Sequence, residues 1–331
     1  MFRFLKSRAY SIGVDIGHDS IKLAQLAVKK EGISLIAGRS ERCPESVKPG
    51  SAAWQKWAVQ AIREATANYR FRSRNVIAAI PANDVFIDHV KVGTQFYSRS
   101  PNGSAELAAN DEKLLQVVLS KVKQKLPFES DNAMIKCLPT EDDNILVMAT
   151  ERKIIDRHLA IYEKAGLTIK SIGAWPVALA NCYSRFFGRR QADLTAIVML
   201  LGIESNCTNV VICRHSRPLF ACSIPIGTTQ LVPDQVGDER IVTGLTLELI
   251  ACRRRFASMY TGAQIERLIF LSAPVVDADI CTTIAKQMEI QAQMGDCLAA
   301  VEIENPYRSG IDRRNGSSNI NWAIAFGLSL S

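Results

Sequence analysis

The chain has 331 residues, of which 47% are hydrophobic and 22% are charged, a balance typical of a globular protein long enough to bury two hydrophobic cores. The net charge of +7 comes from scattered arginine clusters with no aromatic residues alternating between them, so we expect a solvated basic surface, compatible with a nearby anionic membrane, and no nucleic-acid binding. Nine cysteines without a Cys-x-x-Cys pair and four histidines without metal-ligand spacing argue against zinc and favour a reducing compartment.

The first part of the chain predicts a three-stranded meander, a helix and a returning strand. The strands are expected at 10–16, 21–28, 32–39 and 75–80, and the helix at 51–69. Tight turns separate the meander strands, and apolar residues recur at helical spacing along the helix.

A different unit follows, with the order strand, helix, strand, strand, helix, strand. The strands are expected at 85–92, 132–138, 144–150 and 168–172, and the helices at 112–125 and 153–165. Residues 96–110 contain Pro, Asn, Gly and Ser and are interpreted as a surface loop. A small sheet with helices on one face would satisfy this order.

The last part of the chain repeats the opening meander after a helix that begins at Trp175-Pro176 and runs to Phe187. Its strands are expected at 194–201, 208–214, 218–224 and 267–272, its helices at 241–260, 277–288 and 319–330, and a polar loop at 304–318. This internal repeat is the strongest organisational signal in the chain. Two meander-plus-helix lobes with an inserted small α+β subdomain are typical of the α/β fold of actin-like ATPases.

These elements predict three structural units. The first lobe takes residues 1–83 and 173–190, the inserted subdomain 84–172, and the second lobe 191–331, with a shortened helical subdomain around 228–262.

Several short motifs also occur along the chain in a fixed order. They are Gly13-Val14-Asp15-Ile16-Gly17 with Ser20 and Lys22, Leu126-Pro127-Phe128, Ala165-Gly166-Leu167, Trp175-Pro176-Val177-Ala178-Leu179-Ala180-Asn181, Ile224-Pro225-Ile226-Gly227 and Ala323-Ile324-Ala325-Phe326-Gly327-Leu328. As an ordered set they resemble the PilM family, the actin-like cytoplasmic component of type IV pilus assembly. FtsA and the cytoplasmic domain of GspL share them more loosely. The resemblance implies an actin-like fold with a nucleotide cleft between two lobes.

The first candidate phosphate loop joins the first two strands. Its candidate nucleotide-binding residues are Asp15, Gly17, His18, Ser20 and Lys22. A tight turn offers backbone N–H groups to a polyphosphate, Asp15 could hold Mg²⁺, and Lys22 could neutralise phosphate oxygens. However, His18 stands where relatives usually carry a hydroxyl residue, and Asp19 adds an unfavourable carboxylate.

The second candidate loop contains Gly202, Ser205 and Asn206, which could offer turn amides and polar side chains. Relatives place an aspartate two residues before the glycine, where this chain has Leu200. Glu204 lies on the wrong side of the glycine to replace that aspartate, so we expect it to be an exposed turn residue.

The third candidate segment ends the strand at 267–272, where Ser272 is the candidate contact for adenosine. Relatives follow this strand with consecutive glycines, but here Ala273 has a Cβ and Pro274 lacks an N–H group. The segment 228–238, before the next helix, is also shorter than the helical region that family members usually have there. Three departures in separate segments predict that ATP hydrolysis is lost, while binding of ATP and Mg²⁺ stays open.

The resemblance favours a scaffold function. It implies a cytoplasmic protein at the inner face of the inner membrane that binds the tail of a PilN-like membrane protein and connects it to the assembly motor ATPase. The regional expectation for tail binding is the segment around 85–98. The longest apolar run, at 196–201, is far shorter than the about 20 residues that span a bilayer, so membrane association is expected to be peripheral and through partners.

Two alternatives remain open. One is a nucleotide-binding ATPase or switch that gates assembly. The other is an FtsA-like division protein, which a C-terminal amphipathic membrane helix would favour. The last predicted helix instead belongs to the fold, so this reading is the weaker one.

Overall fold

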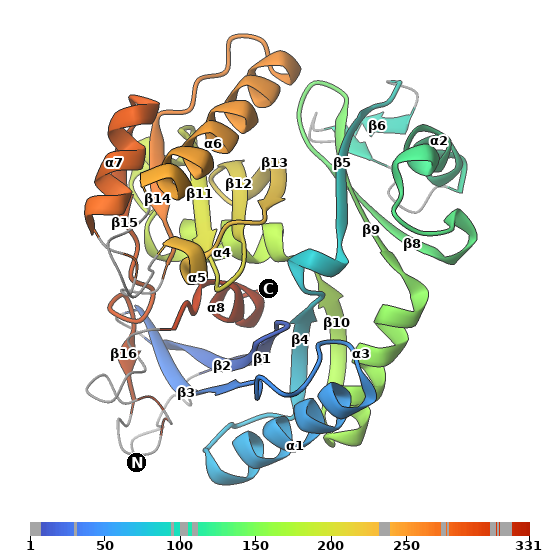
Figure 1. Ribbon diagram of the computed structural model, residues 1–331, viewed down its shortest axis with the longest axis vertical. Coiled ribbons are helices and arrows are strands. Elements are labelled where there is room, and N and C mark those ends of the chain that lie inside the picture. Colours follow the sequence, from blue (N-terminus) through green and yellow to red (C-terminus); the bar gives the residue numbers. More distant parts are fainter. Residues whose placement is uncertain are drawn as a thin grey trace, which may run out of the picture.

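The computed structural model describes residues 8–29, 32–93, 96–99, 105–107, 112–231, 239–272, 276, 278–304, 309, 311 and 320–331. Two large sheets form the body of the molecule (Figure 1). The first contains β1 (Arg8–Ile16), β2 (Ser20–Lys29), β3 (Gly32–Arg42), β4 (Asn75–Ala79), β10 (Thr168–Gly173) and β16 (Glu302–Ile303). The second contains β11 (Ile197–Ile203), β12 (Thr208–Arg214), β13 (Arg217–Ile224), β14 (Arg267–Phe270) and β15 (Gln291–Met294).

The two sheets repeat one topology. Their strand orders are β10-β4-β1-β2-β3-β16 and β13-β12-β11-β14-β15. In each, an antiparallel meander is extended by a parallel strand, β4 beside β1 and β14 beside β11. All seven residues of β11 are buried, as expected for a strand covered on both faces. The predicted duplication of the meander is therefore present.

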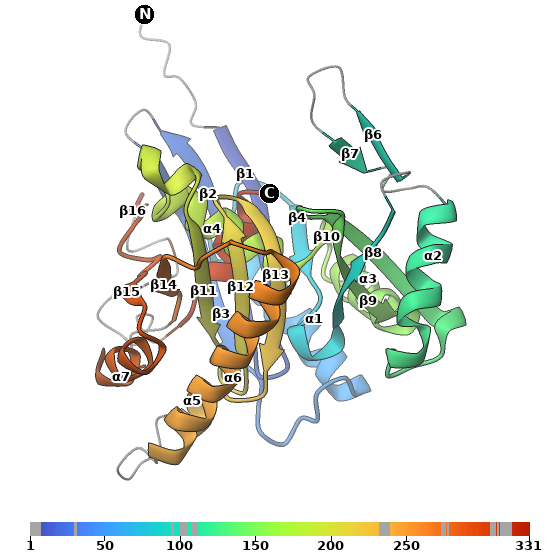
Figure 2. The same ribbon diagram turned by 90° about the horizontal axis from the view of Figure 1, so that it is seen from above.

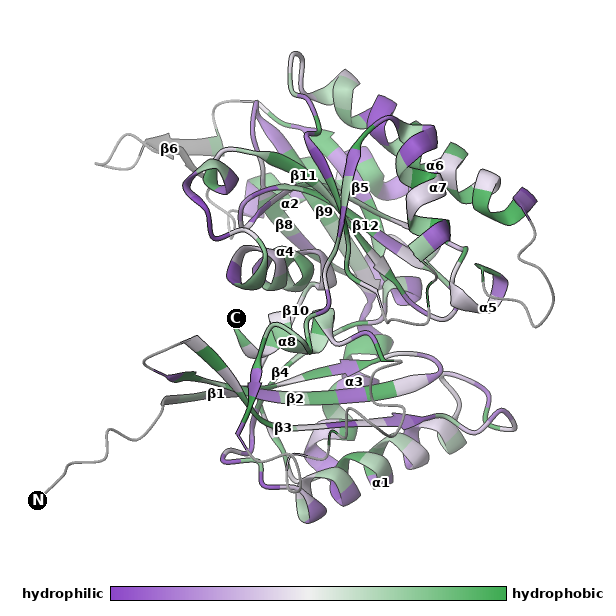
Figure 3. Ribbon diagram, turned by 90° about the vertical axis from the view of Figure 1, so that its left-hand side faces the viewer, coloured by the Kyte–Doolittle hydropathy of each residue, from purple (hydrophilic) through white to green (hydrophobic). Residues whose placement is uncertain are grey.

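Helices form layers outside and between the sheets. They are α1 (Ala52–Asn68), α2 (Glu112–Val122), α3 (Arg152–Lys164), α4 (Trp175–Phe186), α5 (Thr228–Leu231), α6 (Glu239–Met259), α7 (Ala278–Met288) and α8 (Ala323–Ser329). α1 and α3 cover the outer face of the first sheet, and α6 and α7 cover the outer face of the second. α4 and α8 lie between the sheets in the largest hydrophobic core, and the buried strands and α8 are mainly hydrophobic in Figure 3.

Close backbone contacts hold α8 in the middle layer. A Cβ added to Gly13 of β1 would lie 1.9 Å from the carbonyl oxygen of Ala325, and one added to Gly327 would lie 1.8 Å from that of Ala178 in α4. Only glycine allows such approaches. All seven residues of α8 are buried, so this helix packs against both lobes.

The middle layer alters the predicted division into lobes. α4, expected in the first lobe, packs on β11, β12 and β13 of the second sheet, whereas α8, expected in the second lobe, packs on β1, β2 and β4 of the first. Both helices are apolar over most of their surface, so their sequences do not indicate which sheet they cover.

The inserted subdomain is smaller than predicted. Its three-stranded sheet has the order β5-β9-β8 and consists of β5 (Phe86–Lys91), β8 (Ala133–Pro139) and β9 (Asn144–Glu151), with α2 on its outer side (Figure 2). The assignment of α3 and β10 to this subdomain is wrong, because β10 pairs in parallel with β4 and α3 packs beside α1. A strand pattern alone does not show which sheet accepts the strand.

The inserted subdomain also docks onto the second lobe. Asp88 of β5 accepts hydrogen bonds from Arg255 of α6 at 2.9 Å and from Lys125 at 2.7 Å. The imidazole of His89 stacks on Phe220 of β13, with ring centroids 4.4 Å apart, and its Nε2 lies 3.2 Å from the backbone N of Ala221. These contacts cover the β13 edge of the second sheet.

Short elements were missed or displaced in the sequence-based prediction. The expected loop at 96–110 contains β6 (Tyr97–Arg99) and β7 (Ala105–Leu107), and α5, β15 and β16 were not predicted because they are short and lack a clear apolar periodicity. Short 3-10 helices cover Ala82–Asp84, Lys123–Lys125, Ser130–Asn132 and Gln191–Leu194, so β11 begins later than expected. Ala273, Pro274 and residues 232–238 lie outside the described residues.

Candidate functional site

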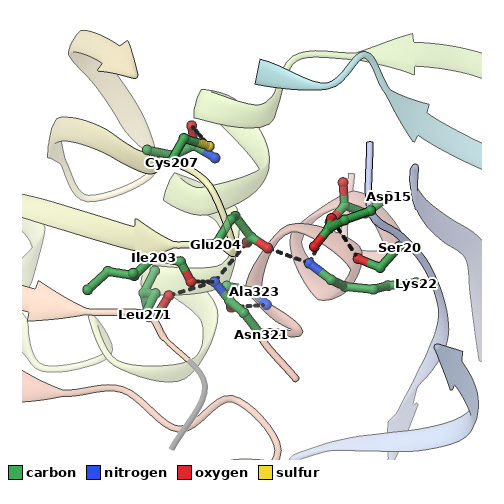
Figure 4. Close-up of polar contacts among 11 residues, drawn as sticks. Asp15, Ser20, Lys22, Ile203, Glu204, Cys207, Leu271, Asn321 and Ala323 are labelled. Carbon is green, nitrogen blue, oxygen red and sulfur yellow. Dashed lines mark hydrogen bonds and ion pairs between the residues drawn. The ribbon is translucent and has the colours of Figure 1, made fainter. Parts of the chain in front are cut away.

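Lys22 lies where the two lobes meet (Figure 4). Antiparallel pairing places it opposite Asp15, and its Nζ is 3.2 Å from Oδ2 of that residue. The same Nζ donates to Oε2 of Glu204, which follows β11 in the second lobe, at 2.6 Å. The side chains of Lys22 and Glu204 are only 7% and 19% exposed. The expectation that Glu204 is an exposed turn residue is therefore wrong.

Asn321, just before α8, extends this network through hydrogen bonds of its side-chain amide. Its Nδ2 donates to Oε1 of Glu204 at 2.9 Å and to the carbonyl oxygen of Leu271 at 2.9 Å, and it lies 3.3 Å from the carbonyl oxygen of Ile203. Its Oδ1 accepts from the backbone N–H of Ala323 at 3.1 Å. One amide side chain thus joins the ends of the parallel strands β11 and β14 to the first turn of α8, and it orients the Glu204 carboxylate toward Lys22.

The network holds two carboxylates and one ammonium group in a buried position. Burial by itself would lower the pKa of Lys22, but the carboxylates of Glu204 and Asp15 outweigh burial and raise this pKa above its ordinary value. Burial raises the pKa of Glu204, the ammonium of Lys22 opposes this change, and Asp15 adds to it. Lys22 is therefore held in its charged form, and it pairs with a carboxylate from each lobe.

The remaining candidate residues of the first loop make hydrogen bonds within the β1–β2 hairpin or to the neighbouring 3-10 turn. The N–H of Gly17 donates to the carbonyl oxygen of Ser20 at 2.8 Å, and the hydroxyl of Ser20 donates to Asp19 at 3.3 Å. The Nε2 of His18 lies 3.2 Å from Oδ2 of Asp84 in the 3-10 turn after β4. The hydrogen bond to Asp84 raises the pKa of His18, against the lowering by burial. Asp15 and Lys22 thus join the central network, whereas Gly17, His18 and Ser20 stabilise the turn.

The second candidate loop is arranged differently from expectation. Gly202 lies inside β11, where it pairs with Asn209 and where an added Cβ would meet Leu179 at 3.1 Å. Its assignment as a turn glycine is wrong, because the strand continues to Ile203. The carbonyl oxygen of Ser205 accepts hydrogen bonds from the N–H and the hydroxyl of Thr229.

Gly227 packs directly on this second turn. A Cβ added there would lie 2.5 Å from the backbone N of Asn206 and from the carbonyl oxygen of Glu204. The segment before α5 therefore covers the backbone of the turn that contains Ser205 and Asn206.

Ser272 follows β14, and among the described residues its buried hydroxyl oxygen has no hydrogen-bond partner. A buried hydroxyl without a partner carries a desolvation cost, so this position has an unused polar group. Of the predicted site residues, it is the one with an unsatisfied side chain.

Two further observations limit the chemistry. In the described part of the chain, no group of three or more His, Cys, Asp or Glu side chains is placed to hold a metal ion. Among the described helices, none has both the length and the apolar character needed to cross a bilayer.

Comparison with known proteins assigns the fold and the family. A family model described as type IV pilus assembly protein PilM matches residues 13–237, which is more than half of the chain. The chain belongs to the PilM family. It is a PilM-like type IV pilus assembly protein with the actin-like ATPase fold, as its sequence motifs indicated. No curated protein matches it in sequence.

Solved structures share the fold of this PilM family member over most of its length. A PilM–PilN type IV pilus biogenesis complex matches with a TM-score of 0.73 and 17% identity, covering 97% of this chain and 98% of the other. An actin-like ATPase-fold protein of unknown function from Bacteroides thetaiotaomicron matches with a TM-score of 0.52 and 9% identity, covering 91% and 96%. The ethanolamine utilization protein EutJ from Carboxydothermus hydrogenoformans matches with a TM-score of 0.51 and 14% identity, covering 98% and 90%.

Two residues of the central network were missed from the sequence. Glu204 follows Gly202, whereas relatives carry the aspartate before the glycine, so the sequence favoured an exposed turn residue at this position. Asn321 is more than a hundred residues away from Glu204 and lies outside the motifs, two residues before the one that begins at Ala323. Glu204 carries a general signal, because side chains at the carboxyl ends of neighbouring parallel strands converge at one edge of a sheet.

Proposed function

We propose that this protein is a cytoplasmic scaffold at the inner face of the inner membrane, which binds the tail of a PilN-like membrane protein and has a degenerate nucleotide cleft. Membership of the PilM family and the likeness to a PilM–PilN complex support the proposal of a PilN-like partner. The ion pair of Lys22 with Glu204 supports the degenerate cleft and carries this part of the proposal.

The central network is a poor fit for Mg·ATP. A polyphosphate between the two turns would compete with Glu204 for Lys22 and would lie beside the carboxylates of Asp15, Asp19 and Glu204. The negative phosphate oxygens and these carboxylates would repel each other strongly, because the position is buried. Lys22 already neutralises Asp15, the residue predicted to hold Mg²⁺. Lys22, Glu204 and Asn321 thus connect the two lobes at the place where a nucleotide would have to bind.

Titration calorimetry with a synthetic peptide of the PilN-like cytoplasmic tail tests the partner. We expect saturable binding that a scrambled peptide does not show. Hydrogen exchange then locates it: added tail peptide should slow exchange in and around β5, at the junction of the first lobe and the inserted subdomain. Absence of binding by the intact protein, or protection confined to the second lobe, contradicts the proposal.

A nucleotide-controlled switch is the second candidate function, and the unsatisfied hydroxyl of Ser272 favours it. Calorimetric titration with Mg·ATP decides between the two. The scaffold proposal predicts no binding up to about 1 mM. Binding to the natural protein that Asp15→Ala abolishes establishes the switch. Binding by Glu204→Gln alone shows that the Glu204 carboxylate blocks the site.

A further inference from the structure

An exposed edge strand lies on the second lobe, on the side of the molecule away from the inserted subdomain (Figure 1). β15 is the last strand of its sheet, and all four of its residues are exposed. Among the described residues, no strand pairs with its outer side. Such an edge is a template on which another extended segment can pair.

The direction of the backbone groups along β15 can be assigned. The N–H of Gly295, directly after the strand, donates to the carbonyl oxygen of Phe270 in β14 at 2.9 Å. Because backbone groups alternate along a strand, those of Gln291 and Gln293 also face β14, and those of Ala292 and Met294 face outward. The outer edge therefore presents two N–H and two C=O groups.

A cavity of about 520 Å³ opens beside this edge. Its wall includes Gln293 of β15, Phe186 and Phe187 at the end of α4, and Arg189 and Arg190 in the loop that follows. Side chains two residues apart share a face of the sheet, and a Cβ added to Gly295 would lie 3.2 Å from the ring of Phe187. A strand added beside β15 would therefore place alternate side chains over the cavity.

The cavity carries excess positive charge. Its acidic residue, Asp193, pairs with Arg267 and also accepts from the backbone N–H of Arg190. A neighbouring cavity of about 340 Å³ shares Phe186 and Arg189 and adds Arg185.

These arginines are available to a ligand. In the part of the chain that the structure describes, Arg185, Arg189 and Arg190 make no ion pair with a carboxylate, and all three are exposed. Leu194 and Met294, neighbours of cavity residues in the chain, are each 42% exposed. Met294 lies on the face of β15 opposite Gln293, so a paired strand with alternating acidic and apolar residues would direct its carboxylates toward the arginines and its apolar side chains toward Met294.

We propose that β15 and the arginine-lined cavity bind an extended acidic segment of a partner protein, which adds a strand to the second sheet and places carboxylates against Arg189 and Arg190. Backbone pairing would supply affinity, and the cavity would supply selectivity. A second copy of this chain is a poorer occupant, because pairing two β15 edges brings the arginines of both copies together. The site is remote from β5, so this inference is independent of tail binding.

Fluorescence anisotropy with two labelled eight-residue peptides tests the proposal, one alternating Glu and Val and the other Lys and Val. The Glu-Val peptide should bind the full chain and protect residues 291–294 from hydrogen exchange, and the Lys-Val peptide should not bind. The double variant Arg189→Ala/Arg190→Ala should weaken binding at least tenfold. Ala292→Pro should do the same, because it removes an outward N–H at an edge where proline is tolerated.

Arg217→Ala, which removes an exposed arginine from the opposite edge strand β13, is the matched charge control and should bind as the natural protein does. Unchanged melting temperatures show that each variant is folded. No binding of the Glu-Val peptide up to about 1 mM overturns the proposal. So does equal binding of both peptides, or a natural dimer that Ala292→Pro dissociates. Binding to vesicles of anionic lipid that needs the arginines but tolerates Ala292→Pro assigns the surface to a membrane instead.

Discussion

At the scale of single residues, the centre of the molecule depends on groups that cannot be exchanged independently. Lys22 pairs with two carboxylates from different lobes, and Asn321 hydrogen-bonds at the ends of two strands. Gly13 and Gly327 leave space for the backbone of α8 and α4. Each of these residues is defined by a neighbour from a distant part of the chain.

The ion pair of Lys22 and Glu204 can be measured with a double-mutant cycle. Lys22→Met should lower the free energy of unfolding by about 3 kcal/mol, because it leaves Glu204 and Asp15 without a positive partner in a buried position. Adding Glu204→Gln should recover part of this loss, which urea unfolding at pH 7 would show as coupling. Strictly additive effects of the two changes would mean that the residues do not interact.

The close approach of α8 and α4 predicts a strong effect of a single methyl group. Gly327→Ala places a Cβ 1.8 Å from a carbonyl oxygen, so the backbone must shift and the cost should be about 3 kcal/mol or more. Gly244→Ala is the matched control, because its Cβ would meet only Ile226 at 4.0 Å and alanine favours the helix. Thermal melting should fall markedly for the first variant and stay equal or rise for the second. Equal melting temperatures would contradict the packing.

At the scale of elements, docking of β5 on β13 and α6 connects the inserted subdomain to the second lobe. Tyr260, directly after α6, donates to Thr140 at 2.7 Å, and Arg214 pairs with Glu141 at 3.2 Å, so contacts extend beyond Asp88 and His89. Several side-chain contacts thus hold the inserted subdomain against the second lobe.

The contact of His89 with the second lobe predicts that the free energy of unfolding depends on pH. Burial, aided by Arg255, lowers the pKa of His89 to about 4, against the opposing effect of Asp88. In the unfolded chain the pKa of a histidine is about 6.5. Neutral His89 therefore contributes its whole stabilising free energy above about pH 6.5, and this free energy is lost as the pH falls to about 4. His89→Gln, which keeps a hydrogen-bond acceptor but does not titrate, should lose less stability between pH 7 and pH 4. His158, whose pKa burial also lowers to about 4, contributes to the dependence that remains. Identical pH profiles in urea unfolding would contradict this role.

At the scale of the whole molecule, internal contacts hold the two lobes together. The Lys22–Glu204 pair, Asn321 and the shared helices α4 and α8 all join the first sheet to the second. A protein that opens and closes around a nucleotide needs a hinge with weaker contacts than these. The arrangement favours a rigid platform.

Small-angle X-ray scattering can check this rigidity. The radius of gyration should not change when Mg·ATP is added, because the lobes are already joined. Asp88→Ala removes the partner of Arg255 and Lys125 and should increase the radius of gyration by releasing the inserted subdomain. Compaction of the natural protein on addition of Mg·ATP would instead indicate a nucleotide-driven closure.

The sequence by itself determined most of the elements, the duplicated meander and the family. Periodic apolar residues and turn residues are local signals, and ordered motifs survive low identity. Only the tertiary structure decided which sheet receives β10, which lobes α4 and α8 cover, and that Glu204 faces Lys22. Those outcomes depend on contacts between separate elements, such as Lys22 and Glu204 at a separation of 182 residues, and neither hydrophobic periodicity nor motif spacing carries that information.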